Sequence, residues 1–251
     1  MEFRPLGSSG LEVSAVALGC WPISGMTSLD VQEADSLATL EACFELGVNF
    51  FDTAFGYGAA GESERLIGRF TGARGKTLGA RRMQMVIATK AGLHWHEGKM
   101  AHDASPATLR RECEQSLARL QTDHVDLLYL HAPDPAVPLA ESAAALAQLL
   151  GEGKTRAVGV SNVSLKQLQE FRAACPVAAV QPPYNMLMRD IEDDLLPYCL
   201  KHQIAVVVYW PLMKGLLAGK LARAHQFTPQ GGRHNSPMFL GEAWPQNQRP
   251  A

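Results

Sequence analysis

Strand-like and helix-like segments alternate along this chain, and that alternation limits the fold more than any other feature. A segment with apolar residues at helical spacing follows each of the first six short apolar runs. Continuous runs of Val, Ile and Leu separated by helices are typical of a parallel sheet that helices cover. The seven apolar runs span residues 15–20, 49–53, 85–90, 125–131, 155–162, 178–185 and 204–211.

The regular repeat favours an α/β (β/α)8 TIM barrel over a doubly wound sheet. The first apolar run is not followed by a GxGxxG pattern, so a Rossmann domain has little support. Residues 3–14 have the pattern of two short strands joined at a Ser-Ser-Gly turn. We expect this N-terminal hairpin to close the bottom of the barrel.

An eighth strand cannot be found after Pro211. Residues 215–227 have the pattern of a short helix, and the rest is rich in Gly, Pro, Asn and Gln, which predicts irregular structure. We therefore predict an incomplete barrel over residues 1–220, with the eighth strand and helix missing, and an irregular tail over 221–251. The first and seventh strands would have open edges, through which the chain could self-associate.

Composition narrows the classes of function. The chain has 251 residues, 47% of them hydrophobic, which suits one large domain. Its formal net charge of -2 gives no support to a nucleic-acid or anionic-membrane partner. The five cysteines are scattered, as is typical of reduced thiols, and neither a signal peptide nor an apolar run of membrane-spanning length is evident. We expect a cytoplasmic protein.

Polar residues stand at the ends of six consecutive predicted strands. In a parallel barrel these ends meet at one mouth, where the chemistry of such folds gathers. A strand-terminal Asp, Lys or His more often has a structural role when it stands alone, but the predicted fold places all of these residues around one cavity. They are Asp52, Lys90, His131, Ser161 with Asn162, Gln181 and Tyr209.

The stretch FFDTAFGYG, residues 50–58, adds Tyr57 between two glycines. A tyrosine has a reference pKa of about 10, and a nearby Lys90 ammonium would lower it by favouring the phenolate. Asp52 would keep that lysine charged and oriented, and His131 could position a substrate oxygen. This set suits protonation of a carbonyl oxygen as a hydride reaches the carbon.

In these motifs the chain resembles the aldo-keto reductase family. The matching pieces are FFDTAFGYG with GESERLIG, VIATKAG, DLLYLHAPDP, GKTRAVGVSN, QPPYN and YWPLMKGLLAGK, in family order over roughly residues 3–220. The resemblance implies that Tyr57 is the general acid, that Lys90 and Asp52 tune it, and that His131 orients the substrate. It also implies reduction of an aldehyde or ketone to an alcohol.

The resemblance further implies a nicotinamide cofactor, usually NADPH, with NADH as the alternative. Substrate would lie against Trp21, Tyr57 and His131. Family members continue into an eighth strand and a loop that grips the adenosine 2'-phosphate, so this chain is C-terminally truncated relative to them. The residues implied to contact the cofactor are Asp52, Ser161, Asn162, Gln181, Tyr209, Trp210, Pro211, Leu212, Gly215, Leu216 and Lys220.

Two other functions stay open at this point. A truncated barrel could be a non-catalytic cofactor-sensing or interaction protein, and Lys90 on a barrel strand could form a Schiff base in a lyase. No Cys or carboxylate completes a recognisable zinc ligand set with the three histidines of residues 94–102, so we expect no metal site there. We expect that segment to be a loop over the active site, with Trp95 as a second candidate for lining the pocket.

Overall fold

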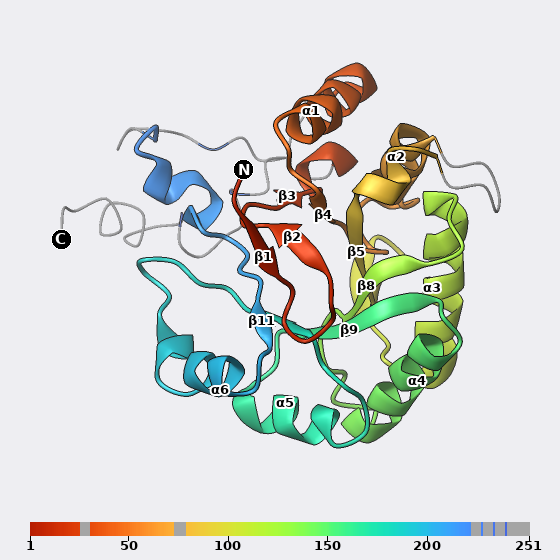
Figure 1. Cartoon of the computed structure of the whole chain (residues 1–251), viewed down its shortest axis with the longest axis vertical. Helices are drawn as coiled ribbons and strands as arrows, with labels where there is room; N and C mark the ends of the chain where they lie inside the picture. Colours follow the sequence, from red (N-terminus) through yellow and green to blue (C-terminus); the bar gives the residue numbers. More distant parts are fainter. Residues whose placement is uncertain (26–30, 73–78, 222–226, 228–232, 234–238, 240–251) are drawn as a thin grey trace.

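The computed structural model describes residues 1–25, 31–72, 79–221 and the single residues 227, 233 and 239. Within these residues, seven parallel strands form one curled sheet in the order β11-β10-β9-β8-β5-β4-β3 (Figure 1). All seven coincide with the predicted apolar runs. Their bounds are β3 (Leu18–Gly19), β4 (Phe50–Asp52), β5 (Val86–Ala91), β8 (Val125–Leu130), β9 (Thr155–Ser161), β10 (Ala179–Gln181) and β11 (Ala205–Val206).

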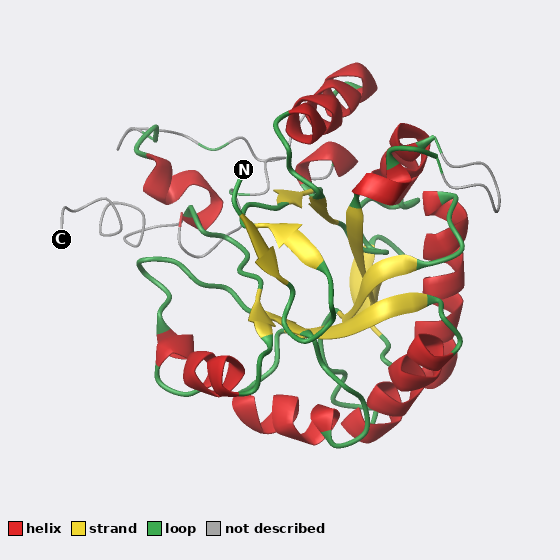
Figure 2. Cartoon of the chain, viewed as in Figure 1, coloured by secondary structure: helices red, strands yellow, loops and turns green. Residues whose placement is uncertain are grey.

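Helices cover the convex side of the sheet, one after each strand through β10 (Figure 2). Ser105 caps α3 with Pro106 in the first turn, and Ser164 forms a capping box with Gln167 at α5. The helices are α1 (Glu33–Glu45), α2 (Glu62–Thr71), α3 (Pro106–Leu120), α4 (Leu139–Gly151), α5 (Leu165–Arg172) and α6 (Leu195–Lys201). No described helix is long and apolar enough to cross a membrane.

The core has two layers, one on each face of the sheet. Apolar side chains between sheet and helices form the larger layer, and a smaller one fills the concave side of the sheet. Every residue of β5 and β8 is buried, because both faces of these strands are covered. This explains why the strands have continuous apolar sequences instead of alternating ones.

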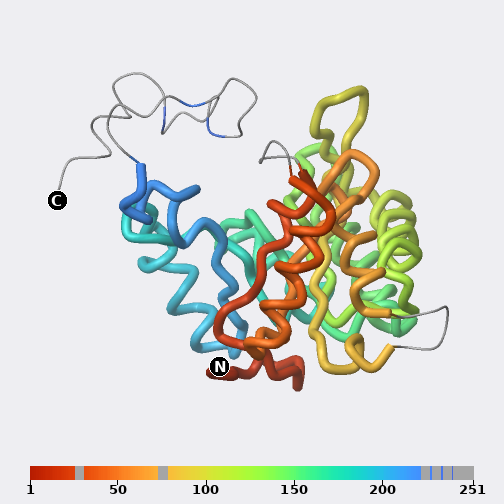
Figure 3. Tube along the Cα trace, turned by 90° about the horizontal axis from the view of Figure 1, so that it is seen from above, coloured from red at the N-terminus to blue at the C-terminus, as the bar shows by residue number. Residues whose placement is uncertain are grey.

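The predicted N-terminal hairpin is confirmed as β1 (Phe3–Pro5) paired with β2 (Glu12–Ser14). Its buried Leu6, Leu11 and Val13 belong to the smaller core layer, and Figure 3 shows the N-terminal segment at one end of the sheet. A Cβ atom at Gly7 would lie 2.1 Å from the backbone oxygen of Ala178, so the hairpin turn packs directly on the sheet backbone. The hairpin closes the N-terminal ends of the strands.

The structure contains one hairpin that the sequence analysis described only as a loop. Strands β6 (Leu93–His96) and β7 (Lys99–His102) pair antiparallel and project from the end of the sheet opposite β1 and β2 (Figure 3). The helical segment that follows β10 is divided into the 3-10 turn η3 (Asp190–Glu192) and α6. Two further 3-10 turns are η1 (Pro22–Ser24) and η2 (Arg82–Gln84).

The two outer strands are the shortest of the sheet. In the part of the chain that the structure describes, β3 pairs only with β4, and β11 pairs only with β10. The 3-10 turn η4 (Met213–Ala218) follows β11 and replaces the start of the helix predicted over 215–227. Most of the predicted irregular tail, 221–251, lies outside the described residues.

Candidate active site

Lys90 is the centre of the site. Its Nζ atom donates hydrogen bonds to both carboxylate oxygens of Asp52, at 2.9 and 2.8 Å, and to the backbone oxygen of Thr53 at 2.7 Å. It also lies 3.2 Å from the hydroxyl oxygen of Tyr57. The structure therefore brings the predicted carboxylate, ammonium and phenol into direct contact, with a backbone acceptor that no side-chain pattern reveals.

Sheet geometry explains why these groups meet. Asp52 ends β4 and pairs with Ala88 on the neighbouring strand β5, and Lys90, two residues beyond Ala88, projects from the same face of the sheet. The loop that carries Tyr57 stays beside β5 because Thr53 and Phe55 donate their backbone N–H groups to the carbonyls of Ala88 and Lys90. The loop thus continues the pairing of β4 with β5 for a few residues.

His131 follows β8, the strand on the other side of β5. Its ring centroid lies 6.0 Å from that of Tyr57, in an edge-to-face arrangement. Trp21, which follows β3, makes a second edge-to-face contact with Tyr57, with centroids 4.9 Å apart. The phenol is therefore flanked by the imidazole and the indole. Below, "polar cluster" means Asp52, Tyr57, Lys90 and His131.

Burial and charge set the protonation of the polar cluster. Burial raises the pKa of Tyr57, and the opposing effect of the Lys90 charge is smaller. The expected lowering of the tyrosine pKa is thus present as a contribution but does not dominate. For Lys90, burial acts to lower the pKa, but Asp52 and Tyr57 together raise it above its ordinary value. The ammonium form is favoured.

Burial, with a smaller contribution from the Lys90 charge, holds the pKa of His131 well below its ordinary value. The imidazole is therefore neutral near pH 7, with one ring nitrogen as donor and the other as acceptor. Its Nδ1 atom has no hydrogen-bond partner among the groups that the structure describes. A neutral ring beside the phenol can donate a hydrogen bond without adding a second positive charge next to Lys90.

The predicted cofactor residues at the ends of β9, β10 and β11 also meet. Asn162 donates from its amide nitrogen to the backbone oxygen of His131 at 2.9 Å, and its amide oxygen accepts from the Tyr209 hydroxyl at 2.8 Å. The Ser161 hydroxyl donates to the backbone oxygen of Gln181. Gln181 in turn donates to Asp52 at 3.1 Å, which joins this group to the polar cluster.

The segment after β11 is more exposed and locally strained. Trp210, Pro211, Leu212 and Lys220 are all exposed. Trp210 has a positive φ of 56°, and its backbone oxygen accepts from the side chain of Asn185 at 3.1 Å. Lys214 places its Nζ atom 4.3 Å from the centre of the Trp210 ring, a cation–π contact that the sequence analysis missed.

Gly215 and Leu216 lie in η4, next to Lys214. Gly215 has φ of 93°, a conformation that favours glycine, and Leu216 is buried in a small apolar cluster with Met213 and Phe239. The predicted cofactor residues of this segment are thus contiguous, but they lie apart from the main core.

Trp95, the second tryptophan expected near the pocket, donates from its indole nitrogen to the backbone oxygen of Gly56 at 3.0 Å. The β6–β7 hairpin is therefore tied to the loop that carries Tyr57. The three histidines of residues 94–102 belong to no group of three or more possible metal ligands among the described residues. His94 instead pairs with buried Glu112 at 2.8 Å.

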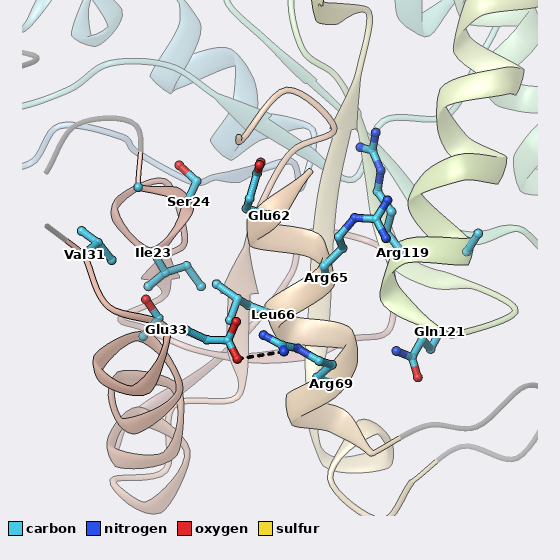
Figure 4. Close-up of a pocket in the computed structure, with 13 residues that line it drawn as sticks. Ile23, Ser24, Val31, Glu33, Glu62, Arg65, Leu66, Arg69, Arg119 and Gln121 are labelled. Atoms are coloured by element: carbon cyan, nitrogen blue, oxygen red, sulfur yellow. Dashed lines mark ion pairs between the residues drawn. The ribbon is translucent and has the colours of Figure 1, made fainter. Parts of the chain in front are cut away.

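One cavity lies away from the polar cluster. A cavity of about 470 Å³ opens between η1, α1, α2 and the end of α3, and no residue of the polar cluster lines it (Figure 4). Its lining includes Arg65, Arg69 and Arg119, and Arg69 is paired with Glu33 at 2.8 Å. We therefore assign the candidate active site from the convergence of polar groups, not from cavity size.

A sequence profile described as Aldo/keto reductase family matches residues 15–249. The aldo-keto reductase YhdN of Bacillus subtilis is 38% identical over 239 residues, which cover 95% of this chain and 70% of that protein. The NADH-specific methylglyoxal reductase of Escherichia coli is 33% identical over 257 residues, covering 96% of this chain and 76% of that protein.

Among solved structures, the glycerol dehydrogenase AKR11B4 from Gluconobacter oxydans superimposes with a TM-score of 0.84 at 38% sequence identity. The match covers 98% of this chain and 74% of that one. This chain therefore spans about three quarters of the length of a complete structure with the same architecture.

Proposed function

The chain belongs to the aldo-keto reductase family and is an oxidoreductase of carbonyl compounds, and from that premise we propose that it reduces an aldehyde or ketone to an alcohol with NADPH. In this proposal Tyr57 is the proton donor. The observation that carries it is the position of Lys90 Nζ, 3.2 Å from the Tyr57 hydroxyl and 2.8 Å from an Asp52 oxygen. That geometry couples the phenol to a permanent positive charge.

The Tyr57 phenol is the proton source in this proposal. Since burial raises its pKa, it holds its proton at neutral pH, which is the form that an acid needs. It donates that proton to the substrate oxygen as a hydride reaches the carbonyl carbon, and the products are an alcohol and a phenolate. The Lys90 ammonium, 3.2 Å away, stabilises the phenolate until solvent reprotonates it.

Asp52 and His131 have supporting roles. The Asp52 carboxylate accepts two hydrogen bonds from Lys90 and so keeps the ammonium charged and oriented. The neutral imidazole of His131 donates a hydrogen bond to the substrate oxygen and aligns it with the phenol. A charged imidazolium there would be disfavoured, because burial and the Lys90 charge both lower the pKa of His131.

The residues at the ends of β9, β10 and β11 fit a nicotinamide. Asn162 and Gln181 carry amide groups that can pair with a carboxamide, and the ring of Tyr209 offers a half-exposed face for stacking. Together with Ser161 they would hold the nicotinamide ring next to Tyr57. The dinucleotide supplies the hydride when it is bound.

The segment from Trp210 to Lys220 would hold the rest of the dinucleotide. Two lysines and the positive-φ backbone around Gly215 suit a pyrophosphate group. We propose NADPH over NADH, and the E. coli relative named as NADH-specific keeps NADH as the alternative to test. The names of the two relatives suggest methylglyoxal as the first substrate for reduction and glycerol as the first for the reverse reaction.

The Schiff-base alternative is less compatible with the site. An amine nucleophile must be neutral, whereas the contacts with Asp52 and Tyr57 raise the pKa of Lys90. A binding protein without catalysis remains the second candidate, because β3 and β11 each have only one strand neighbour among the described residues. Self-association through those edges would accompany it.

The deciding experiment measures NADPH oxidation by the purified chain with methylglyoxal, and NADPH binding by quenching of protein fluorescence. Tyr57→Phe should leave NADPH binding nearly unchanged and reduce turnover by about 10²- to 10⁴-fold, the usual contribution of a positioned acid. Tyr198→Phe, the same change at a tyrosine that accepts from Arg172, is the control.

Turnover that survives in Tyr57→Phe would contradict the assignment of the proton donor. Binding of NADPH without turnover in the unaltered chain would favour the cofactor-sensing alternative. Trapping of a substrate on Lys90 by borohydride would favour the lyase.

A further inference from the structure

We propose that Arg119, together with the buried Glu64, is a positioning residue that holds the Tyr57 hydroxyl within hydrogen-bond reach of Lys90. The inference rests on the proposed role of Tyr57 and adds two residues that touch neither substrate nor cofactor in that proposal. It is carried by a chain of contacts that joins α2, α3 and β5 to the loop of residues 53–61.

Arg119 lies in the last turn of α3 and reaches the loop that carries Tyr57. Its Nη1 atom donates to the backbone oxygen of Phe55 at 3.1 Å, and its guanidinium carbon lies 4.1 Å from the centre of the Phe55 ring. In Figure 4 its side chain extends from α3 alongside α2. Arg119 therefore contacts both the backbone and the side chain of a residue two positions before Tyr57.

Glu64 makes this contact rigid. Its side chain is fully buried, and one of its oxygens accepts from Arg119 Nη1 at 3.1 Å. The other oxygen accepts from the Thr89 hydroxyl at 2.6 Å. Without these two donors the buried Glu64 charge would be unpaired and would strongly destabilise the folded state. We therefore expect Glu64, Arg119 and Thr89 to keep their positions together. Thr89 directly precedes Lys90 on β5, which connects both halves of the Tyr57–Lys90 pair to these three side chains.

Phe55 is consequently held from two sides. Its N–H donates to the Lys90 carbonyl at 3.0 Å, and its carbonyl accepts from Arg119. The far end of the loop packs on the same guanidinium, because a Cβ atom at Gly61 would lie 2.4 Å from Arg119 Nη1. Gly61 also has φ of 75°, which favours glycine. The loop is thus clamped before and after Tyr57.

The contacts of Arg119 with Phe55 and Gly61 matter because the Tyr57–Lys90 contact is long. At 3.2 Å it lies at the upper end of hydrogen-bond distances, so a small outward shift of the loop would break it. Displacement of a catalytic group by about 1 Å can cost about 10²-fold in rate. If Arg119 no longer held Phe55, we expect the loop to move outward, so that Lys90 stabilises the Tyr57 phenolate less well.

The test must separate this effect from a loss of folding. Other charged or titratable groups face Tyr57 from the surrounding elements, and none of them contacts Arg119 directly. They are Lys90 on β5, Asp52 on β4, His131 after β8, Cys20 after β3 and Tyr209 after β11. A change in the Tyr57 titration on substitution of Arg119 therefore reports movement of the loop.

Two variants are informative. Arg119→Lys keeps the charge beside Glu64 but loses the planar group that spans Glu64 and Phe55. The double variant Arg119→Met, Glu64→Gln removes both charges together and so leaves no buried charge unpaired. Arg110→Lys is the matched control, because Arg110 lies on the same helix and pairs with Glu152 at the surface.

The primary readout is the ionisation of Tyr57, measured as the pH-dependent tyrosinate absorbance of each variant minus that of the same variant with Tyr57→Phe. The pKa of Tyr57 should shift by about one unit in both Arg119 variants, because outward movement of the loop changes both the burial of the phenol and its distance from Lys90. In turnover assays kcat should fall by about 10- to 100-fold with little change in KM. Arg110→Lys should match the unaltered chain.

Folded Arg119 variants with an unchanged tyrosinate titration and unchanged kcat would overturn the inference. The titration needs no turnover, so it also decides the matter if the unaltered chain proves inactive. In that case the proposed function is wrong, and the titration alone tests whether Arg119 and Glu64 position Tyr57.

Discussion

The strands that carry the polar cluster and the segment that follows β11 are held in place by different kinds of contact. The strand β8 pairs with β9 from Val125 to Leu130, and its side chains are buried on both faces. The strands β10 and β11 share only the pairs Ala179–Ala205 and Val180–Val206. In Figure 1 the strands β5, β8 and β9 lie inside the arc of helices, whereas β11 lies at the edge of the sheet.

This difference teaches that the acid–base chemistry and the proposed cofactor binding depend on different parts of the fold. The polar cluster is organised around Lys90, whose ammonium hydrogens all have acceptors at hydrogen-bond distance. The segment after β11 is held by isolated contacts, such as that of Asn185 with the Trp210 carbonyl. We therefore expect substitutions in the two regions to have separable effects, in the order that follows.

The largest effect should come from the core beneath the polar cluster. Phe51 is fully buried on β4, next to Asp52, and Phe51→Ala should lower the free energy of unfolding by about 3–5 kcal/mol. Leu212→Ala, in the exposed segment, should change it by less than about 0.5 kcal/mol. Denaturant titrations of both variants check the comparison. Similar losses would mean that the segment after β11 is as firmly packed as the sheet.

A smaller effect should appear as a pH dependence of stability. Burial lowers the folded-state pKa of His131, so the unfolded chain binds a proton more readily below about pH 6.5. The unaltered chain should therefore lose up to about 1.4 kcal/mol per pH unit from this group as pH falls from about 7 toward the folded-state pKa. His131→Asn should lack that part of the acid-side loss in denaturant titrations at several pH values.

An equal acid-side slope in the unaltered chain and in His131→Asn would show that the imidazole is not held neutral. A useful control is His202→Asn, because His202 is a histidine in the C-cap position of α6, away from the polar cluster.

The smallest effect should come from Lys214. Its ammonium lies over the Trp210 ring, and contacts of this kind contribute about 0.5–1 kcal/mol at exposed sites. We expect Lys214→Met to weaken NADPH binding by about three- to tenfold, with a weaker dependence of affinity on salt and the kcat unchanged. Fluorescence titration at two salt concentrations checks this. A large fall in kcat would show that the two regions are not separable.

Several parts of the site could be predicted because they depend on strand order alone. Asp52, Lys90, His131, Ser161 and Gln181 lie at or next to the ends of five neighbouring parallel strands, and the sheet brings such ends to one edge whatever the loops do. The hairpin β6–β7 was described only as a loop, because its sequence is rich in His and charged residues and lacks the apolar alternation of a strand.

The direction in which the Tyr57 pKa shifts also could not be predicted from the Tyr57–Lys90 pair alone. Proximity to Lys90 was foreseen and lowers the pKa, but burial raises it by more, and the extent of burial depends on Trp21 and the other groups packed around the ring. Glu64 and Arg119 were missed for a related reason. On α2, Glu64 looks like one of several surface charges, and only its position under Phe55 and beside Thr89 makes it a buried partner.

The sequence by itself determined the parallel barrel architecture, the N-terminal hairpin and the set of polar residues at the strand ends, because these follow from local periodicity and from chain order. Only the tertiary structure decided which charges are buried, which backbone oxygens accept from them and how the loop of Tyr57 is held. Those properties depend on distances between side chains far apart in the chain, such as the 3.1 Å between Arg119 and Glu64, and no local pattern encodes such a distance.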